Sequence, residues 1–200
     1  MNPKRTALKS LELGQIPETA WELLREGVNS GKSPLHTPCL GTTGEHGPAL
    51  RTVVLRHCIK NERVVACHCD RRSAKVREAL DNPWATWLFY DRERKLQLRM
   101  AGPATVHLDD DFADRAWKNT RDMGRACYNT MTGPGQYVPA PSAAPGRITG
   151  ETEERSARHH FAVIACRVEF IDWLVLSVEG HRRAHFHWRQ RGWQGNWISP

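Results

Sequence analysis

Two neighbouring segments joined by a short charged turn most strongly limit the folds open to this chain. Trp84–Tyr90 is rich in aromatic residues, and Lys95–His107 begins with apolar side chains that alternate with polar ones. Alternation with a period of two is typical of a strand with one buried face. The intervening Asp91–Arg94 has the length of a hairpin turn, so the two segments predict an antiparallel pair.

Strand-like segments recur along the chain and outnumber helical ones. Helical periodicity covers about residues 16–29, Asp70–Leu80 with Asp70 as N-cap, and Asp109 to Trp117. Most gaps between strands fit hairpins, so we predict an α+β protein, mainly β, with an antiparallel barrel and peripheral helices. The strand-like segments are Cys39–Thr43, Ala49–Arg56, Arg63–Cys69, Trp84–Tyr90, Lys95–His107, Phe161–Trp173, Leu174–Val178, Ala184–Trp188 and Trp193–Ile198.

The length and the apolar content fit one domain. The chain has 200 residues, of which 40% are hydrophobic, so we predict a single domain over residues 1–200, with a long Pro- and Gly-rich loop at about 128–158. No run approaches the roughly 18 apolar residues that cross a bilayer. Met1–Ser10 carries three basic residues with no apolar stretch behind them. We therefore expect a cytoplasmic protein with no membrane partner.

Six cysteines and ten histidines raise the question of a metal site. His57-Cys58 and Cys67-His68-Cys69 are the densest groups, but neither has the gap of about two to four residues that separates ligands in structural zinc sites. Strand alternation also turns adjacent side chains to opposite faces. We predict no metal, and we expect buried thiols instead of a disulfide framework.

A formal charge of +7 favours an anionic partner, which charge alone leaves as nucleic acid, a membrane surface or a phosphorylated small molecule. The informative segment is Asp70–Lys75, because Arg71, Arg72 and Lys75 fall in the first turn of a predicted helix. Cations oppose the positive end of a helix dipole, and a bound phosphate would compensate them. On helix chemistry alone, a solvated basic face remains the alternative.

Four motifs then follow one another along the sequence. They are Arg51-Thr-Val-Val-Leu-Arg56, Asp70-x-Arg72-Ser73-x-Lys75, Asn82-Pro83, and Leu96-Gln97-Leu98-Arg99 with Gly102 after it. In this order and spacing they resemble the signatures of the pyridoxamine 5′-phosphate oxidase family. The resemblance implies an antiparallel split β-barrel that binds FMN between the two subunits of a homodimer.

The resemblance also implies which residues contact FMN. Arg51 would lie on the phosphate side, Ser73, Lys75 and Arg72 would hold the phosphate, and Gln97 would bond the polar edge of the isoalloxazine ring because an amide both donates and accepts. Trp173 and Arg183, which are ten positions apart, would come from the second subunit. The implied set is Arg51, Thr52, Val53, Val54, Leu55, Arg56, His68, Cys69, Arg72, Ser73, Lys75, Gln97, Trp173 and Arg183, with His68 and Cys69 contacting FMN through their backbone only.

The substrate side departs from the family. The family's Arg-Leu-His motif corresponds without gaps to Glu179-Gly180-His181, and a carboxylate there would repel a substrate phosphate. A shifted alignment would match Arg183-Ala184-His185 instead, but the flavin-contacting arginine would then lose its counterpart. Arg56 also replaces a lysine. We therefore expect an FMN-dependent oxidoreductase with a changed pocket, in which His181 and His185 are the candidates for proton handling.

Two other function classes remain open at this stage. A split barrel can also serve as a flavin- or haem-binding module without turnover, because a fold does not fix a function. A nucleic-acid binder is disfavoured, since the basic residues are spread along the chain and no recognised nucleic-acid motif is present. We expect a small-molecule substrate, which the sequence does not identify.

Overall fold

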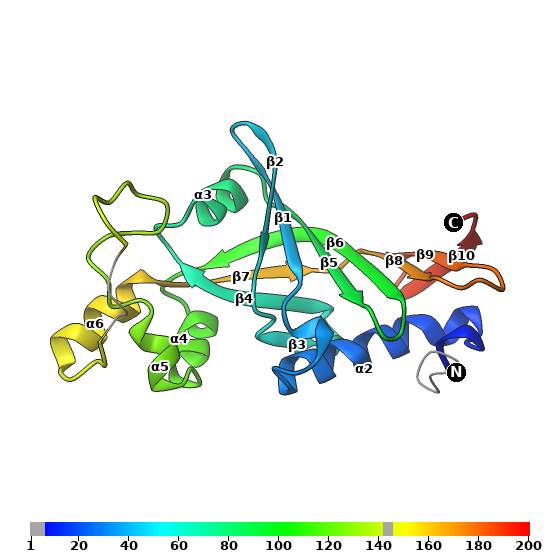
Figure 1. The fold of residues 1–200 in the computed structure, drawn as a ribbon, viewed down its shortest axis with the longest axis horizontal. Coiled ribbons are helices and arrows are strands. Elements are labelled where there is room, and N and C mark those ends of the chain that lie inside the picture. The colour runs from blue at the N-terminus through cyan, green and yellow to red at the C-terminus, as the bar shows by residue number, and fades with distance from the viewer. Residues whose placement is uncertain (1–6, 142–145) are drawn as a thin grey trace.

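The computed structural model describes residues 7–141 and 146–200, and within these ranges ten strands form one branched antiparallel sheet (Figure 1). The strands are β1 (Cys39–Gly44), β2 (Gly47–Thr52), β3 (His57–Ile59), β4 (Val64–Asp70), β5 (Trp84–Asp91), β6 (Leu96–His107), β7 (Phe161–Arg167), β8 (Phe170–Val175), β9 (Arg182–Arg189) and β10 (Gly192–Ile198). The helices are α2 (Ile16–Asn29), α3 (Ala74–Asp81), α4 (Asp111–Lys118), α5 (Asp122–Ala126) and α6 (Glu151–His160), with short 3₁₀ turns η1 (Leu13–Gln15), η2 (Pro34–His36) and η3 (Lys60–Glu62).

Strand β6 is the branch point of the sheet. Its first part, Leu96–Ala101, pairs with both β5 and β8, whereas Ala104–His107 pairs with β7. The main strand order is β10-β9-β8-β6-β5-β1-β2, and β7 continues through β4 to β3. No pairing within the described ranges joins these free edges. The prediction of a mainly β, antiparallel fold is confirmed, but closure into a barrel is wrong, because β10, β2 and β3 end the sheet without pairing with one another.

Gly102 marks the point at which β6 changes neighbours. A Cβ atom there would lie 2.1 Å from the carbonyl oxygen of Arg167, so the chain passes too close for any side chain. Just beyond, the backbone N–H of Glu169 donates to the carbonyl of Ala101 at 2.9 Å. The single strand predicted for Phe161–Trp173 is therefore wrong. It divides into β7 and β8 at this crossing, and both halves are apolar, so the hydrophobic pattern does not mark the break.

The helices cover the sheet at separate places (Figure 1). Helix α2 occupies the residues of the predicted opening helix and buries Ile16, Trp21 and Leu24 in the main core. Helices α4, α5 and α6 gather at the other end of the molecule, over a second cluster that contains Trp117 and Phe161. Helix α3 packs beside β1 and β6. None of the helices in the described ranges is long and apolar enough to cross a membrane.

The segment before β7 differs from the predicted loop at 128–158. Helix α6 begins at Glu151 and takes up the end of that loop. Three glutamates lie in its first turn, and Arg158, His159 and His160 lie in its last, an arrangement that the helix dipole favours. Few apolar residues are present, which is why hydrophobic periodicity does not indicate this helix. Residues 142–145 of the predicted loop lie outside the described residues.

Candidate functional site

Six of the predicted FMN residues fall into two groups on different parts of the sheet, together with neighbouring charged residues. The α3 group (Arg51, Arg72, Ser73 and Lys75) surrounds the start of α3 and the edge strand β2. The sheet-face group (Gln97, Arg99, Asp172, Arg183 and His185) lies on one face of β6, β8 and β9. Five strand-to-strand steps separate β2 from β9, which at about 4.8 Å per step is roughly 24 Å. One chain therefore presents two separate groups of candidate residues.

Arg51 is held by a network with the first turns of α3. Its Nη2 lies 2.7 Å from Glu78 Oε2, its Nη1 donates to the hydroxyl of Thr42, and that hydroxyl donates to Glu78 at 2.5 Å. Burial raises the pKa of Glu78, but the bonds from Thr42 and Arg51 and the charges of Arg51 and Lys75 outweigh it, so the pKa lies below its usual value. The arginine is thus ion-paired inside the chain.

The start of α3 differs from the predicted helix over Asp70–Leu80. The helix begins at Ala74 and Ser73 holds the N-cap position, so the assignment of Asp70 as N-cap is wrong. The Ser73 hydroxyl donates to the carbonyl of Asp70 at 2.6 Å and caps no helix N–H. Within the described ranges, the Lys75 ammonium forms neither a hydrogen bond nor an ion pair. The N–H of Val76 donates to the carbonyl of Ser73 at 3.0 Å, so among the described residues the N–H groups of Ala74 and Lys75, with the Lys75 ammonium, are the donors left for an anion at this helix start.

Arg72 is fully engaged by its own chain. Its Nε and Nη2 form a fork with Asp70 at 2.9 and 2.6 Å, and its other bonds reach Thr130 and the carbonyl of Met131 at 2.9 to 3.2 Å. Burial raises the pKa of Asp70, but the hydrogen bonds and charge of Arg72 outweigh it and hold the pKa below its usual value. Arg72 therefore ties residues 130–131 to the start of α3.

In residues 51–56, the group best placed to contact a ligand is a backbone N–H and not a side chain. Thr52 and Arg56 are exposed, Val53 and Val54 are half-buried, and Leu55 lies fully in the core. The N–H groups of Val53 and Leu55 donate to backbone carbonyls of the segment before β1 at 2.9 and 2.8 Å. In the described parts of the chain, the N–H of Val54 has no acceptor. This alternation leaves the Val54 N–H for a ligand.

His68 and Cys69 turn to opposite faces of β4, as the alternation requires. Cys69 lies in the main core, and burial raises the pKa of its thiol. His68 Nε2 lies 2.8 Å from His57 Nε2. Burial, with the charges of His57 and Arg56, lowers the pKa of His68 to about 3, and burial also lowers the pKa of His57. Sequence reasoning missed this pair, because the predicted strand Ala49–Arg56 ends before His57. The pairing of His57 with Ala66 across β3 and β4 puts the two histidines on one face.

Asp172 organises the sheet-face group. It is 1% exposed, and Arg183 reaches it through Nε at 3.0 Å and Nη2 at 2.8 Å. Arg99 and His185 lie at 3.1 and 3.4 Å. Burial raises the pKa of Asp172, but Arg183, His185 and Arg99 outweigh it, so the pKa is low. Sequence reasoning missed this carboxylate. It could have been found as the one charged residue within the otherwise apolar strand Phe170–Val175.

Two late candidates lie apart from this group. Trp173 pairs with Ala184 across β8 and β9, and Arg183 is the neighbour of Ala184. Because adjacent residues of a strand point to opposite faces, the two predicted flavin contacts lie on opposite faces of the sheet. The Trp173 side chain is 1% exposed and belongs to the main core. His181 is exposed in the turn between β8 and β9, where its Nδ1 accepts the N–H of Ser177 at 3.0 Å. Of the two proton-handling candidates, only His185 joins the sheet-face group.

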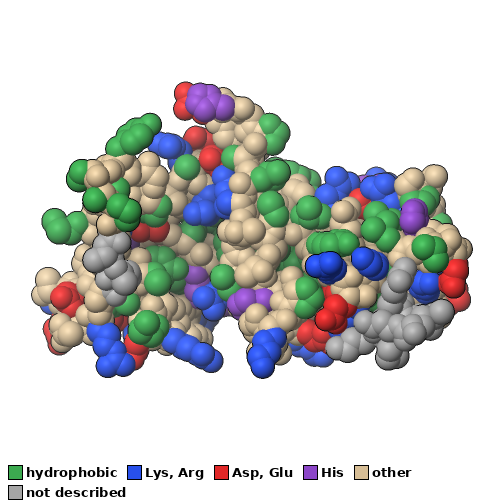
Figure 2. Space-filling model, viewed as in Figure 1, with side chains coloured by type: hydrophobic (Ala, Val, Ile, Leu, Met, Phe, Trp, Pro, Cys, Tyr) green, Lys and Arg blue, Asp and Glu red, His purple; other side chains and the backbone are tan. Residues whose placement is uncertain are grey.

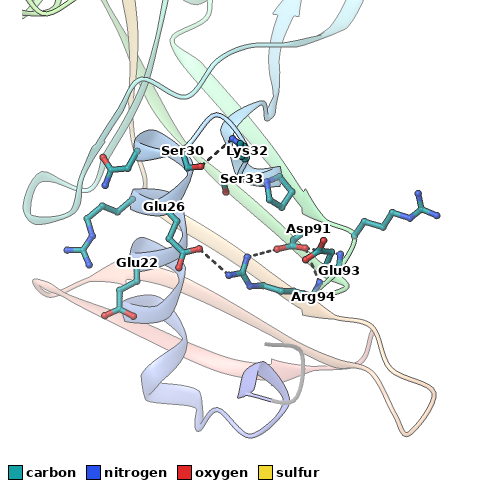
Figure 3. Close-up of a pocket in the computed structure, with 12 residues that line it drawn as sticks. Glu22, Glu26, Ser30, Lys32, Ser33, Asp91, Glu93 and Arg94 are labelled. Atoms are coloured by element: carbon teal, nitrogen blue, oxygen red, sulfur yellow. Dashed lines mark hydrogen bonds and ion pairs between the residues drawn. The ribbon is translucent and has the colours of Figure 1, made fainter. Parts of the chain in front are cut away.

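A cleft of about 1000 Å³ between α2 and the β5–β6 turn contains none of these candidates (Figure 3). Arg94 lies at its centre and bridges Glu26 at 3.1 Å and Asp91 at 2.7 Å. Asp91 also accepts the backbone N–H groups of Glu93 and Arg94 at 2.9 Å. The network attaches the turn to α2, and the four acidic residues that line the cleft are matched by four basic ones, so its role is structural.

Metal ligands and basic side chains are the remaining features of interest. In the described part of the chain, no group of three or more His, Cys, Asp or Glu side chains is placed to hold a metal ion, and the six cysteines are free thiols. Figure 2 shows Lys and Arg side chains in separate groups among acidic and apolar ones on the face in view. A nucleic-acid surface typically carries a continuous basic stripe instead.

Comparison with known proteins assigns the fold. A pyridoxamine 5′-phosphate oxidase-related, FMN binding protein from Nostoc punctiforme is 23% identical, with a TM-score of 0.71 over 96% of this chain and 99% of its own. PhzG from Burkholderia lata, solved in complex with tetrahydrophenazine-1-carboxylic acid, is 17% identical, with a TM-score of 0.68 over 100% and 98%. The chain therefore has the pyridoxamine 5′-phosphate oxidase-like fold.

Sequence comparison agrees with this assignment. Residues 19–108 match the family model of the pyridoxamine 5′-phosphate oxidase FMN-binding domain. That range contains the α3 group and Gln97, and the resemblance inferred from the motifs is confirmed. No curated protein is similar enough in sequence to count as a match.

Proposed function

We propose that this protein binds FMN and works as an FMN-dependent oxidoreductase with a substrate pocket unlike that of pyridoxamine 5′-phosphate oxidase. The proposal is carried by one observation: the range that matches the FMN-binding domain contains an uncapped helix start with an unpaired lysine, Lys75. FMN, when bound, supplies the hydride and electron chemistry. The residues of the chain bind it, orient it and shape the space beside it.

The charges around α3 fit a phosphate group. Arg51, Arg72 and Lys75 carry three positive charges against the two carboxylates of Asp70 and Glu78, which leaves the group net positive. A phosphate at the helix start would accept backbone N–H groups and the Lys75 ammonium. Arg51 would join only by giving up Glu78, and Arg72 would remain with Asp70. We therefore assign the main phosphate contact to Lys75.

Two copies of the chain would complete each site. The roughly 24 Å between β2 and β9 separates Arg51 from Arg183. Gln97 and Arg99 are nearer to α3, but they lie on the face of β6 opposite the core in which α3 packs, so one FMN would not join the two groups of a single chain. The sheet face also carries exposed Trp84, Leu88 and Tyr90 on β5, next to Gln97 and Arg99 on β6. Burying these apolar side chains against a second copy would stabilise a homodimer.

In the ungapped correspondence with the family, this chain lacks an arginine at one position of the substrate side. Glu179 stands there, and its carboxylate lies 2.7 Å from Lys9 Nζ. An ion-paired carboxylate is poorly suited to a substrate phosphate. We therefore propose a small-molecule substrate that does not need a phosphate contact at residue 179.

An FMN titration of the purified protein tests the cofactor assignment. We expect Lys75→Met to weaken FMN binding about 10- to 150-fold, from the loss of a charge-assisted bond of about 1.5–3 kcal/mol. Lys118→Met, at the exposed end of α4, is the matched control. Equal affinities for the wild type and Lys75→Met would reject the phosphate site. Anaerobic mixing with reduced nicotinamides and pyridoxamine phosphate then tests turnover, because a flavin that no donor bleaches indicates a binding module.

Subunit mixing tests the shared site. Lys75→Met and Gln97→Leu alter different half-sites, so a mixed dimer would contain one intact site and one doubly altered site. We expect about half of the sites in each mixed dimer to bind FMN tightly and with the wild-type flavin spectrum. If mass measurement shows that mixed dimers form but their tightly bound FMN has only the altered spectrum of Gln97→Leu, each FMN is held by one chain.

A further inference from the structure

Three polar side chains form a hydrogen-bonded chain near the start of β3 and the end of β4. His57 Nε2 lies 2.8 Å from His68 Nε2, and His68 Nδ1 lies 3.4 Å from the hydroxyl oxygen of Thr120. That hydroxyl lies 2.8 Å from the carbonyl oxygen of Ala116. The proposed FMN contacts use none of these three side chains.

The carbonyl at one end of the chain sets the direction of each hydrogen bond. A carbonyl only accepts, so the Thr120 hydroxyl donates to Ala116, and its oxygen accepts Nδ1–H of His68. Burial lowers the pKa of both histidines, so each ring is neutral at pH 7 and carries one proton. His68 Nε2 therefore has a lone pair and accepts Nε2–H of His57. The lone pair of His57 is then on Nδ1.

His57 Nδ1 is available to a ligand. Among the described residues it has no hydrogen-bond partner, and it is not one of the unpaired polar atoms that are shielded from solvent. His57 directly follows residues 51–56, in which the Val54 N–H is also without an acceptor. The free lone pair thus belongs to the residue after the segment that the family resemblance assigns to FMN.

The groups packed around His57 keep its ring neutral. Arg56 precedes it, and the positive charge of Arg56 contributes to the lowered pKa of His57. On the α4 side, the centroid of the Phe112 ring lies 5.3 Å from that of His57. Phe112 also stacks on His107, which is paired with Asp110 at 2.7 Å. In the described part of the chain no carboxylate is paired with His57, and a neutral imidazole is the form that accepts a proton.

We infer that His57 Nδ1 accepts the proton that the substrate loses in the proposed oxidation, and that His68 is a positioning residue. The inference rests on the proposed function. Oxidation at a carbon next to an O–H or N–H group breaks two bonds. The hydride of the C–H bond would go to FMN, and the proton of the O–H or N–H bond goes to His57 Nδ1. The charge formed on His57 strengthens its bond to His68, since charge-assisted hydrogen bonds are roughly twice as strong as neutral ones.

The tautomers of the two rings test this geometry without FMN. In FMN-free protein at pH 7, long-range proton–nitrogen NMR should show His57 protonated at Nε2 and His68 protonated at Nδ1. The opposite tautomer of either ring would overturn the inference, whether or not FMN binds. This measurement uses the wild type, so it remains decisive if a substitution prevents folding.

Flavin reduction then separates proton loss from hydride transfer. Benzylamine, pyridoxamine and benzyl alcohol lose a proton as well as a hydride, whereas a reduced nicotinamide loses only a hydride. We expect His57→Gln to slow reduction of bound FMN by the amine or alcohol at least about 100-fold, and to leave reduction by the nicotinamide unchanged. His46→Gln, in the exposed turn between β1 and β2, is the matched control and alters neither rate.

Rescue by a conservative variant tests His68. His68→Gln keeps an oxygen that can accept Nε2–H of His57, whereas His68→Leu removes the acceptor. With the amine or alcohol, we expect His68→Leu to reduce FMN about tenfold more slowly than His68→Gln, from the loss of a hydrogen bond to a charged group. With the nicotinamide, the two variants should have equal rates.

Three kinetic outcomes would overturn the inference while the proposed function stands. The first is an unchanged rate with the amine or alcohol in folded His57→Gln. The second is an equal loss with amine and nicotinamide, which would mean general damage to the flavin site. The third is a flavin that the nicotinamide bleaches but no amine or alcohol does. A bound flavin that no donor bleaches would instead reject the proposed oxidoreductase, and the inference with it.

Discussion

Arg183 on β9 donates two parallel hydrogen bonds to the carboxylate of Asp172 on β8, at 3.0 and 2.8 Å. The carboxylate is buried, whereas Arg183 is one-quarter exposed at its side chain. A forked pair of this kind fixes the plane of the guanidinium. Arg183 is therefore presented in one orientation on the face where the second half of the FMN site is proposed.

Asp172→Asn should destabilise the protein by about 1–3 kcal/mol, because Arg183, Arg99 and His185 lose their common carboxylate. Since the folded pKa of Asp172 is low, its contribution is present above pH of about 4 and is lost as the pH falls through the folded pKa. Urea unfolding at pH 7 and at low pH measures both effects. Asp81→Asn, at the exposed end of α3, serves as control. A difference from the wild type that persists at the lowest pH would contradict the assignment.

Arg72→Lys should loosen residues 130–131, because lysine cannot form the fork with Asp70 and reach Thr130 as well. We expect faster proteolysis after α5 and a melting temperature a few degrees lower, at about 2–4 °C per kcal/mol for a chain of this size. Arg155→Lys, whose pair with Glu151 is exposed at 3.7 Å, should change neither property. Weaker FMN binding with unchanged proteolysis would instead support the phosphate role that the resemblance implies for Arg72.

The sequence predicted the parts of the fold that depend on local patterns. The alternation in β6, the charged turn before it and the apolar stripe of α2 all have short-range causes. The change of neighbours at Gly102 depends on Arg167, which is 65 positions away. No local periodicity reports such a crossing, and the predicted barrel and the undivided strand were wrong for that reason.

The sequence indicated which residues of the candidate site lie near one another better than it indicated which residues they bind. Motif spacing brought Arg51, Ser73 and Lys75 together around α3, where the structure also has them. The spacing did not reveal that Glu78 binds Arg51 or that Asp70 binds Arg72, because helix phase and a long loop decide those pairs. The spacing of Trp173 and Arg183 matched that of the family, but the register of β8 and β9 places their side chains on opposite faces of the sheet.

Gln97→Leu should change the flavin more than the phosphate contact. In the structure Gln97 pairs across β6 and β8 with Leu174 and stands on the same face as Arg183, away from Lys75. We expect a shifted flavin absorbance band and reduction potential, with an FMN affinity that falls less than in Lys75→Met. Gln194→Leu, at an exposed position of β10, is the control. A loss of stability with an unaltered flavin spectrum would make Gln97 structural.

The His57–His68 pair should make stability depend on pH between about 5 and 7. Burial lowers both pKa values in the folded protein, that of His68 to about 3, whereas unfolded histidine titrates near 6.5. As the pH falls below about 6.5 the unfolded chain takes up these protons first, so stability is full above that pH and declines below it.

The melting temperature measured from pH 8 to pH 5 should therefore fall, and His68→Gln should fall less steeply because glutamine takes up no proton. The exposed His46→Gln controls for removal of a histidine in general. Parallel curves for the wild type and His68→Gln would show that His68 titrates alike in both states. The 2.8 Å contact between the two Nε2 atoms requires that at least one ring be neutral, so ring-proton NMR at pH 6 provides an independent check.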